Sequence, residues 1–284
     1  MPMQNPSWPN NKRIAVALTV MFETWSEGKS PTYFTRTTPL KPGMVDHAGI
    51  EWSEFGGREG IWRILRLLER ARVKATIFTN ALSAERFPDA VRAAAKAGHD
   101  IAGHGWSQDI YLSDLSGDEQ QAMIRRCLDT LERASGARPR GWVCNVYSWN
   151  QDTFERLVRE GVRWHSDALD ASLPRLQHTP AGPIVAIPWC DFVDNRVLRA
   201  SPRDYFDVYK DTFDYLHASE PMGMLHIAVH GHFGGRALIA AQFEKLLSYF
   251  TGFPDVWLPR HQELADWFLA QKAEDLGYAK RFFT

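Results

Sequence analysis

Three short segments that lie far apart in the chain each end in a side chain suited to acid–base chemistry. The apolar run 14–22 is followed by Glu23, the segment AGHDIAGHGW at 97–106 carries His104, and LHIAVHGHFGGR at 225–236 carries His230. Carboxylates and imidazoles are the usual proton-transfer groups of enzymes. In a barrel of parallel strands, the residues at the carboxyl ends of the strands line the active site. The segments therefore predict a hydrolytic site built from Glu23, His104 and His230.

The elements that must position these residues alternate between strands and helices along the chain. Strands are expected at 13–22, 74–79, 100–102, 141–144, 162–165, 184–187, 224–230 and 256–258. Helices are expected at 60–71, 88–97, 117–134, 153–160, 201–217, 238–250 and 261–270. Such alternation is typical of an α/β fold with a parallel sheet covered by helices. About seven strand–helix units favour a (β/α) barrel over an open sheet.

Length and composition favour one large domain. The chain has 284 residues and is 44% hydrophobic, which suffices for a full core. We predict an N-terminal arm at 1–12 and a single barrel domain at 13–284. Residues 24–57 are polar and rich in glycine and proline. A loop of that length inside a compact domain is usually functional, so we expect 24–57 to act as a lid.

Charge and cysteine content exclude several classes of function. The net charge is −1 and no basic block appears, so no nucleic-acid partner is expected. Three cysteines without a CxxC pair argue against a disulfide framework or a zinc knuckle, and we predict a cytoplasmic protein with reduced thiols. No apolar run is long enough to span a bilayer, so no membrane partner is expected. The many aromatic residues and the long loop suggest a homodimer or homotetramer.

The histidines near the predicted site allow two interpretations. His226, His230 and His232 would share one face if their strand continued through all three. Three histidines in seven residues can indicate a metal site. The alternative is one catalytic histidine, one that faces substrate or packs, and a glycine-rich turn. We prefer the alternative, because metal sites usually also need a carboxylate or a distant ligand pair. His99, at the start of its strand, is interpreted as structural.

The segment KATIFTNALSAERFPDAVRAAAKAGHDIAGHGW at 74–106 resembles the central part of the polysaccharide deacetylase (NodB-homology) superfamily. The resemblance extends from about residue 13 to residue 270 and implies a distorted (β/α) barrel. Metal-dependent members carry two aspartates after the first strand, where this chain has Met21, Phe22 and Glu23. Gln108 stands where those enzymes have a second metal-binding histidine. The resemblance therefore favours a metal-independent enzyme, with no metal ligands assigned.

Further motifs resemble one branch of that superfamily. FETWSEG at 22–28, EFGGREGIWRILRLLE at 54–69 and HGHFGGR at 230–236 are similar to the metal-independent allantoinases and the cyclic imide hydrolases. This resemblance implies a hydrolase that opens a small cyclic amide or imide. Glu23 would hold the ring N–H or activate water, while His104 and His230 would be acid/base and oxyanion donor in an order left open. The expected substrate contacts are Trp25, Trp106, Trp189, Asp194, Asn195, His226 and Arg236.

Two other readings of the same residues stay open besides an allantoinase. In the first, Glu23, His104 and one of the three later histidines would hold zinc or manganese in a divalent-metal amidase or deacetylase of N-acyl substrates. In the second, the fold would bind small cyclic ligands without turning them over. The retention of His104 and His230 argues against a non-catalytic binder.

Overall fold

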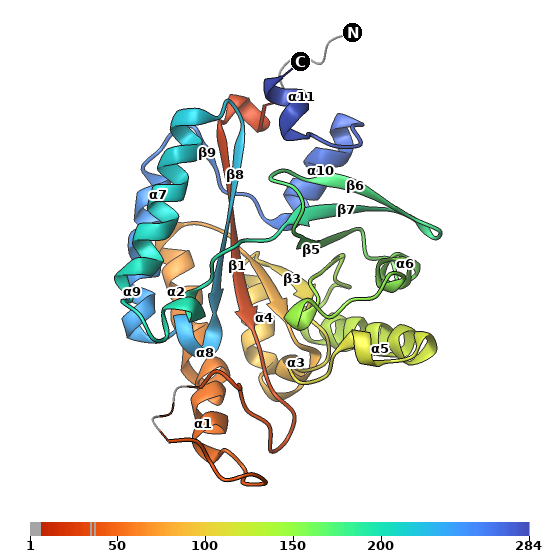
Figure 1. Ribbon diagram of the computed structural model, residues 1–284, viewed down its shortest axis with the longest axis vertical. Coiled ribbons are helices and arrows are strands. Elements are labelled where there is room, and N and C mark those ends of the chain that lie inside the picture. Colours follow the sequence, from red (N-terminus) through yellow and green to blue (C-terminus); the bar gives the residue numbers. More distant parts are fainter. Residues whose placement is uncertain (1–6, 35, 37, 284) are drawn as a thin grey trace.

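The computed structural model describes residues 7–34, 36 and 38–283 and contains a curled, mostly parallel sheet of nine strands (Figure 1). The strands are β1 (Ile14–Phe22), β2 (Thr76–Thr79), β3 (Asp100–Gly103), β4 (Gly141–Trp142), β5 (Trp164–Ala168), β6 (Arg175–Thr179), β7 (Gly182–Pro188), β8 (Gly223–His230) and β9 (Val256–Trp257). Their order is β6-β7-β5-β4-β3-β2-β1-β8, with β9 paired to β1. All pairs are parallel except β6–β7. The predicted distorted (β/α) barrel is confirmed.

The helices follow the strands in sequence and pack around the sheet. They are α1 (His47–Phe55), α2 (Ile61–Ala71), α3 (Ala81–Arg86), α4 (Pro88–Lys96), α5 (Gly117–Ser135), α6 (Thr153–Arg159), α7 (Arg203–Ser219), α8 (Gly231–Gly234), α9 (Ala237–Thr251), α10 (His261–Gln271) and α11 (Tyr278–Phe282). Figure 1 shows α2, α7 and α9 together beside β1 and β8. No helix in the described part of the chain is long and apolar enough to cross a membrane.

The first strand shows how the barrel divides its side chains between two layers. Every residue of β1 is buried. Val16, Leu18 and Val20 pack in the cluster that includes α2, α7 and α9, while Ala17 and Met21 belong to the inner cluster. Because side chains alternate across a strand, Glu23 continues the inward-facing set. Burial on both faces is typical of a parallel strand and explains the unbroken apolar run.

Two local predictions differ from the structure. Residues 24–57 were predicted as one loop, but α1 occupies His47–Phe55 and joins α2 through a π-helical turn at Gly56–Gly60. The Asp46 carboxylate accepts a hydrogen bond from the Gly49 amide at 2.7 Å and so begins the helix. Strand β6 was not predicted, because it is a half-exposed edge strand without an apolar run. Edge strands of this kind carry a weak hydrophobic signal.

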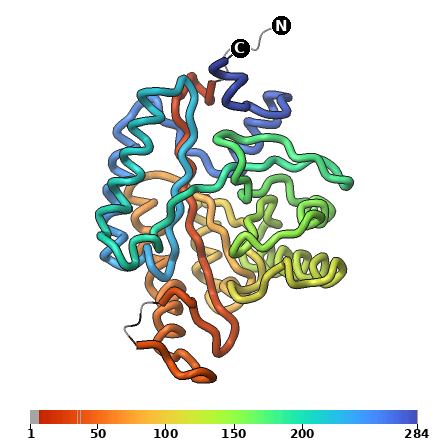
Figure 2. Tube along the Cα trace, viewed as in Figure 1, coloured from red at the N-terminus to blue at the C-terminus, as the bar shows by residue number. Residues whose placement is uncertain are grey.

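The segment before β1 and the segment after it lie at opposite ends of the barrel. Figure 2 traces the chain from the carboxyl end of β1 to α1, at the same end of the molecule as the carboxyl end of β8. At the amino end of β1, Trp8 is buried, donates a 2.8 Å hydrogen bond to the Gly223 carbonyl and packs on Trp267. Residues 1–6 of the predicted arm lie outside the described residues. In the described part of that arm, Trp8 is the buried residue that packs in the core.

Candidate active site

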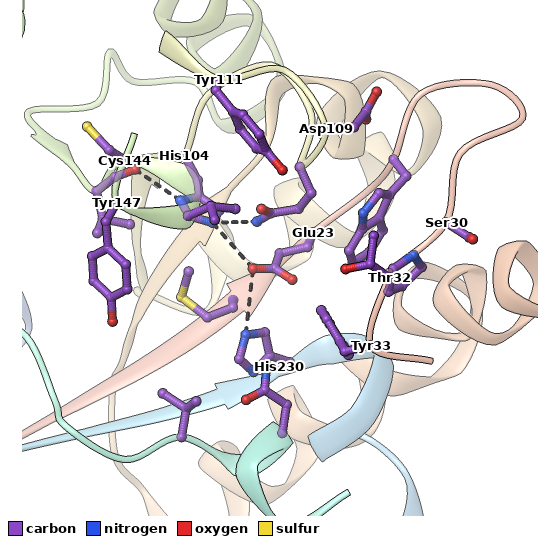
Figure 3. Close-up of a pocket in the computed structure, with 18 of the residues that line it drawn as sticks. Glu23, Ser30, Thr32, Tyr33, His104, Asp109, Tyr111, Cys144, Tyr147 and His230 are labelled. Carbon is purple, nitrogen blue, oxygen red and sulfur yellow. Dashed lines mark hydrogen bonds and ion pairs between the residues drawn. The ribbon is translucent and has the colours of Figure 1, made fainter. Parts of the chain in front are cut away.

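The register of β1 with β8 brings Glu23 and His230 together. Met21 pairs with His230, so the carboxyl ends of the two strands lie side by side. His230 Nε2 is 3.6 Å from Glu23 Oε1. Both side chains are buried, at 7% and 8% exposure. Two strand ends thus deliver a carboxylate and an imidazole to one point, and Figure 3 shows Glu23 between the two histidines His104 and His230.

His104 reaches the same point from β3. Its Nε2 lies 3.3 Å from Glu23 Oε1, and its Nδ1 donates a 3.0 Å hydrogen bond to the Val143 carbonyl. Because that carbonyl can only accept, Nδ1 carries a proton and Nε2 faces the site. The Gln108 amide donates to Nε2 at 2.6 Å. His104 is therefore oriented as a proton acceptor.

Asp194 lies behind His230 and holds it by two hydrogen bonds. His230 Nδ1 donates to Asp194 Oδ1 at 2.5 Å, and the His230 backbone amide donates to Oδ2 at 2.8 Å. Asp194 is fully buried and begins the short helical turn after β7. A Cβ atom at Gly234 would lie 2.4 Å from Asp194 Oδ2, so the glycine of HGHFGGR lets α8 pass close to this carboxylate. The pair fixes both the orientation and the proton of His230.

The charges of this group reinforce one another. Burial alone would lower the pKa of His230, but the carboxylates of Asp194 and Glu23 outweigh burial and raise it to about 9. Burial would raise the pKa of Glu23, but the neighbouring imidazoles, that of His230 above all, lower it to about 2. At neutral pH the site therefore contains an imidazolium against a carboxylate. The Nε2–H of the His230 imidazolium is the proton that faces Glu23.

A cavity of about 530 Å³ opens over these groups. That volume is typical of small-molecule sites. Aromatic side chains form much of its wall, and the rim carries charged and polar groups, as Figure 3 shows for the residues it labels. The lining includes Glu23, Trp25, Tyr33, His104, Gln108, Asp109, Tyr111, Cys144, Tyr147, Trp189, Asn195 and His230. The cavity therefore places one carboxylate and two imidazoles beside aromatic walls.

The side chains that could offer ligands to a divalent metal ion here are Glu23, His104 and His230. Among the described residues, no group of three His, Cys, Asp or Glu side chains is placed to hold one. The Nε2 lone pair of His104 is taken by the N–H of the Gln108 amide, which is no ligand for a cation. To ligate a metal ion, His230 would have to release its Nε2 proton, which the carboxylates of Asp194 and Glu23 help to hold.

Three residues expected at the substrate lie outside the cavity. His226, four residues before His230, bonds Thr19 Oγ1 at 2.6 Å and the Pro188 carbonyl at 3.0 Å inside the barrel. Trp106 follows Gly105, whose backbone is in the left-handed region. The Arg126 guanidinium carbon lies 3.6 Å from the centroid of the Trp106 ring. Arg236 donates to the backbone carbonyls of His232 and Trp52. Each of these side chains has a partner within the protein.

Of the other expected substrate contacts, three line the cavity and the fourth holds a residue that lines it. Trp25, Trp189 and Asn195 line the cavity. Asp194 was expected at the substrate, but its carboxylate faces His230 from behind. Tyr33 was missed, since it lies in an aperiodic segment and meets its partner His232 across 199 positions. Tyr111 and Tyr147 were also missed. A tyrosine in a loop carries no periodic signal, so only the folded chain reveals these three.

Comparison with known proteins finds similar chains among deacetylases and an allantoinase. Residues 52–165 match the polysaccharide deacetylase family. The peptidoglycan deacetylase of Helicobacter pylori is 21% identical, over 76% of this chain and 85% of its own length. The crystal structure of Puue allantoinase is 28% identical, covers 94% of this chain and 95% of its own, and has a TM-score of 0.83. A "probable polysaccharide deacetylase" from Pseudomonas aeruginosa PAO1 is 26% identical over 93% of both chains, with a TM-score of 0.81.

The fold and the site define a hydrolase that acts on carbon–nitrogen bonds. The resemblance to the polysaccharide deacetylase family is confirmed by the family model over residues 52–165 and by similar chains that cover more than nine-tenths of this one.

Proposed function

We propose that this protein opens a cyclic amide or imide ring by general acid–base catalysis. The observation that carries the proposal is the arrangement around Glu23: two imidazoles face one carboxylate, and each has its outer nitrogen fixed. Asp194 fixes His230, and the Val143 carbonyl fixes His104. One imidazole is thereby prepared to donate a proton and the other to accept one.

His230 is assigned as the acid and oxyanion donor. Its pKa of about 9 keeps Nε2 protonated at neutral pH, and Nε2 faces the cavity side of Glu23. A charged donor placed where negative charge develops stabilises a tetrahedral intermediate, typically by 10²- to 10³-fold in rate. The same proton can then pass to the ring nitrogen as the C–N bond breaks.

His104 is assigned as the base and Glu23 as the acceptor of the ring N–H. A carboxylate with a pKa of about 2 takes a proton from water poorly, whereas a hydrogen bond to an N–H needs no proton transfer. Water attacks the carbonyl carbon and gives one proton to His104 Nε2, with the Gln108 amide moving aside. The C–N bond breaks, and the nitrogen leaves with the proton of His230. The product is a half-amide, and solvent returns the proton from His104 to His230.

The aromatic walls support a flat ring as the substrate. Trp25, Tyr33 and Trp189 line the cavity from three separate segments. Aromatic faces offer a large apolar area with defined geometry to a planar ring. Imides are more reactive than simple amides, so acid–base groups can act on them without a metal.

Allantoinase activity is the second candidate, favoured by the likeness to Puue allantoinase. Allantoin also contains a cyclic amide, so the same three groups would serve. The deacetylase names among the relatives make removal of an acetyl group from an N-acetyl sugar the third candidate. A cytoplasmic location and a homodimer or homotetramer stay predictions.

The deciding experiment measures turnover of succinimide, maleimide, allantoin and chitooligosaccharides by one preparation, before and after dialysis against a chelator. Metal content is measured on the same samples. Chelator-resistant release of a half-amide from the imides, without stoichiometric metal, supports the proposal. Turnover of allantoin alone selects the second candidate, and acetate release selects the third. Activity that disappears with the chelator and returns with zinc or manganese overturns the assignment of His104 and His230 as proton-transfer groups.

A further inference from the structure

His232 is buried against the catalytic carboxylate without lining the cavity. It lies in α8, one turn beyond the end of β8, and is 0% exposed. Its ring is packed among aromatic rings from other segments, with centroid distances of 5.2 Å to Trp25 and 5.1 Å to Trp52. Such packing leaves the ring little freedom to turn.

The two ring nitrogens of His232 face different partners. Nε2 lies 2.8 Å from the hydroxyl of Tyr33. Nδ1 lies 3.8 Å from Glu23 Oε2 and has no hydrogen-bond partner among the described residues. A buried polar atom without a partner is costly and needs an explanation. Here the atom is aimed at the one carboxylate oxygen that neither His104 nor His230 contacts.

The surroundings determine which nitrogen carries the proton. Burial lowers the pKa of His232 to about 3 despite the nearby Glu23, so the ring is neutral with a single proton. Burial, reinforced by the carboxylates of Glu23 and Asp194, raises the pKa of Tyr33, so its hydroxyl keeps its proton and can donate. If the His232 proton were on Nε2, the Nδ1 lone pair would face a carboxylate oxygen with no donor beside it, which is repulsive. At His104 Nε2 the same repulsion is offset by the Gln108 amide, which donates to that nitrogen. If Tyr33 donates to Nε2, the proton lies on Nδ1 and points at Glu23.

We propose that Tyr33 and His232 form a relay that positions Glu23: the Tyr33 hydroxyl donates to His232 Nε2, and His232 Nδ1–H orients Glu23 Oε2. This leaves Oε1 between His104 and His230 for the ring N–H. Catalytic hydrogen bonds are often long in a free enzyme and tighten with substrate, so the 3.8 Å separation fits a contact completed on binding. His232 is a positioning residue, since it acts only through Glu23.

Tyr33 gives the relay a second property. It lies in the segment between β1 and α1, and it also lines the cavity. A substrate that contacts Tyr33 therefore also touches the group that determines the tautomer of His232. The relay couples occupation of the cavity to the orientation of the carboxylate, and its catalytic consequence rests on the proposed ring-opening function.

The first test reads the tautomer and needs no activity. Long-range proton–nitrogen spectra of ¹⁵N-labelled protein distinguish Nδ1–H from Nε2–H for each histidine. We expect His232 to be neutral with the proton on Nδ1 between pH 5 and 8, and the Tyr33→Phe variant to shift toward Nε2–H. A native Nε2–H tautomer, or a tautomer that Tyr33→Phe leaves unchanged, overturns the relay even if the ring-opening function holds.

The second test is kinetic and uses whichever ring substrate is turned over. Because Phe keeps the ring of Tyr33 and removes only the hydroxyl, Tyr33→Phe should lower kcat about tenfold, as for loss of one hydrogen bond to a charged group, with KM little changed. His232→Gln should lower kcat similarly, and the double variant should be no slower than His232→Gln alone. Tyr249→Phe, which removes a hydroxyl bonded to Asp214 far from the site, is the matched control and should leave kcat unchanged. Multiplying effects in the double variant, or a change in KM alone, overturn the proposal.

Discussion

Two groups of buried histidines lie in the same barrel in opposite electrostatic surroundings. At the carboxyl ends of the strands, His230 faces two carboxylates, which raise its pKa to about 9. Deeper in the barrel, the ring centroids of His226 and His261 lie 4.8 Å apart. His226 is hydrogen-bonded to the hydroxyl of Thr19, and His261 to the hydroxyl of Thr76. Burial lowers the pKa of His226 to about 4 and also holds the pKa of His261 well below its ordinary value. Burial keeps the inner histidines neutral, whereas the two carboxylates beside His230 outweigh burial and keep it protonated.

The comparison teaches that depth along one strand separates the two roles. His226 and His230 lie on the same face of β8, four residues apart, opposite Ala17 and Met21 of β1. The inner position is closed by the Pro188 carbonyl and Thr19. The outer position opens on the cavity. Each prediction below removes a feature that one group has and the other lacks.

Loss of the Glu23 charge should have the largest effect. We expect Glu23→Gln to slow ring opening by roughly 100- to 1,000-fold, because the ring N–H loses a charged acceptor and His230 loses one of the two charges that hold its proton. Glu160→Gln is the matched control, since the Glu160 side chain is 8% exposed against 7% for Glu23 but pairs with Arg125 and Arg138 away from the site. Steady-state rates of both variants check this. Unchanged turnover in Glu23→Gln would remove Glu23 from the mechanism.

Loss of the Asp194 charge should make His230 resemble the inner histidines. Asp194→Asn keeps an acceptor for Nδ1–H but removes a charge that raises the pKa of His230. The protonated form is the active one and is lost as pH rises through that pKa. The pH at which kcat/KM decreases on the alkaline side should therefore move from near 9 to a value roughly one to three units lower.

The control for Asp194→Asn is the surface pair His217–Asp255. Its atoms lie 2.9 Å apart on the outside of the barrel, so Asp255→Asn should leave the pH profile unchanged. An alkaline limb that stays in place in Asp194→Asn would show that a group other than His230 is the acid.

The sequence predicted the strands and the convergence of their ends better than it predicted what lies behind them. Glu23, His104 and His230 each follow an apolar run, and parallel strands bring such positions to one edge. Trp106 would share the face of His104 if the strand continued, but Gly105 turns the chain at φ +73°. The alternation of side chains along a strand also cannot distinguish His226 from His230. It predicts which face of the strand a side chain lies on, but not how close that side chain is to the open end of the barrel. The contact between Tyr33 and His232 depends on packing that no local pattern encodes.

Substitution of His226 should affect stability and leave chemistry intact. His226→Ala leaves Thr19 Oγ1 and the Pro188 carbonyl without their partner, which should lower the free energy of unfolding by about 1–3 kcal/mol before any cost of the void. Chemical denaturation measures this, with His217→Ala on the surface as the control. The kcat of the folded variant should stay within about twofold of the native value. A large fall in kcat at unchanged stability would instead place His226 at the substrate.

Trp189 lies at the boundary between the two groups and should give the smallest effect. Its ring lines the cavity and meets the ring of His226 edge-on at 4.6 Å. If it is only a wall for a flat substrate, it contacts ground state and transition state equally. Trp189→Phe should then raise KM about threefold and leave kcat unchanged, since uniform binding appears in KM alone. A fall in kcat without a change in KM would mean that Trp189 couples the packing of the inner histidines to catalysis. The two groups of histidines could then not be treated as separate, because Trp189, which both contact, would be part of the mechanism.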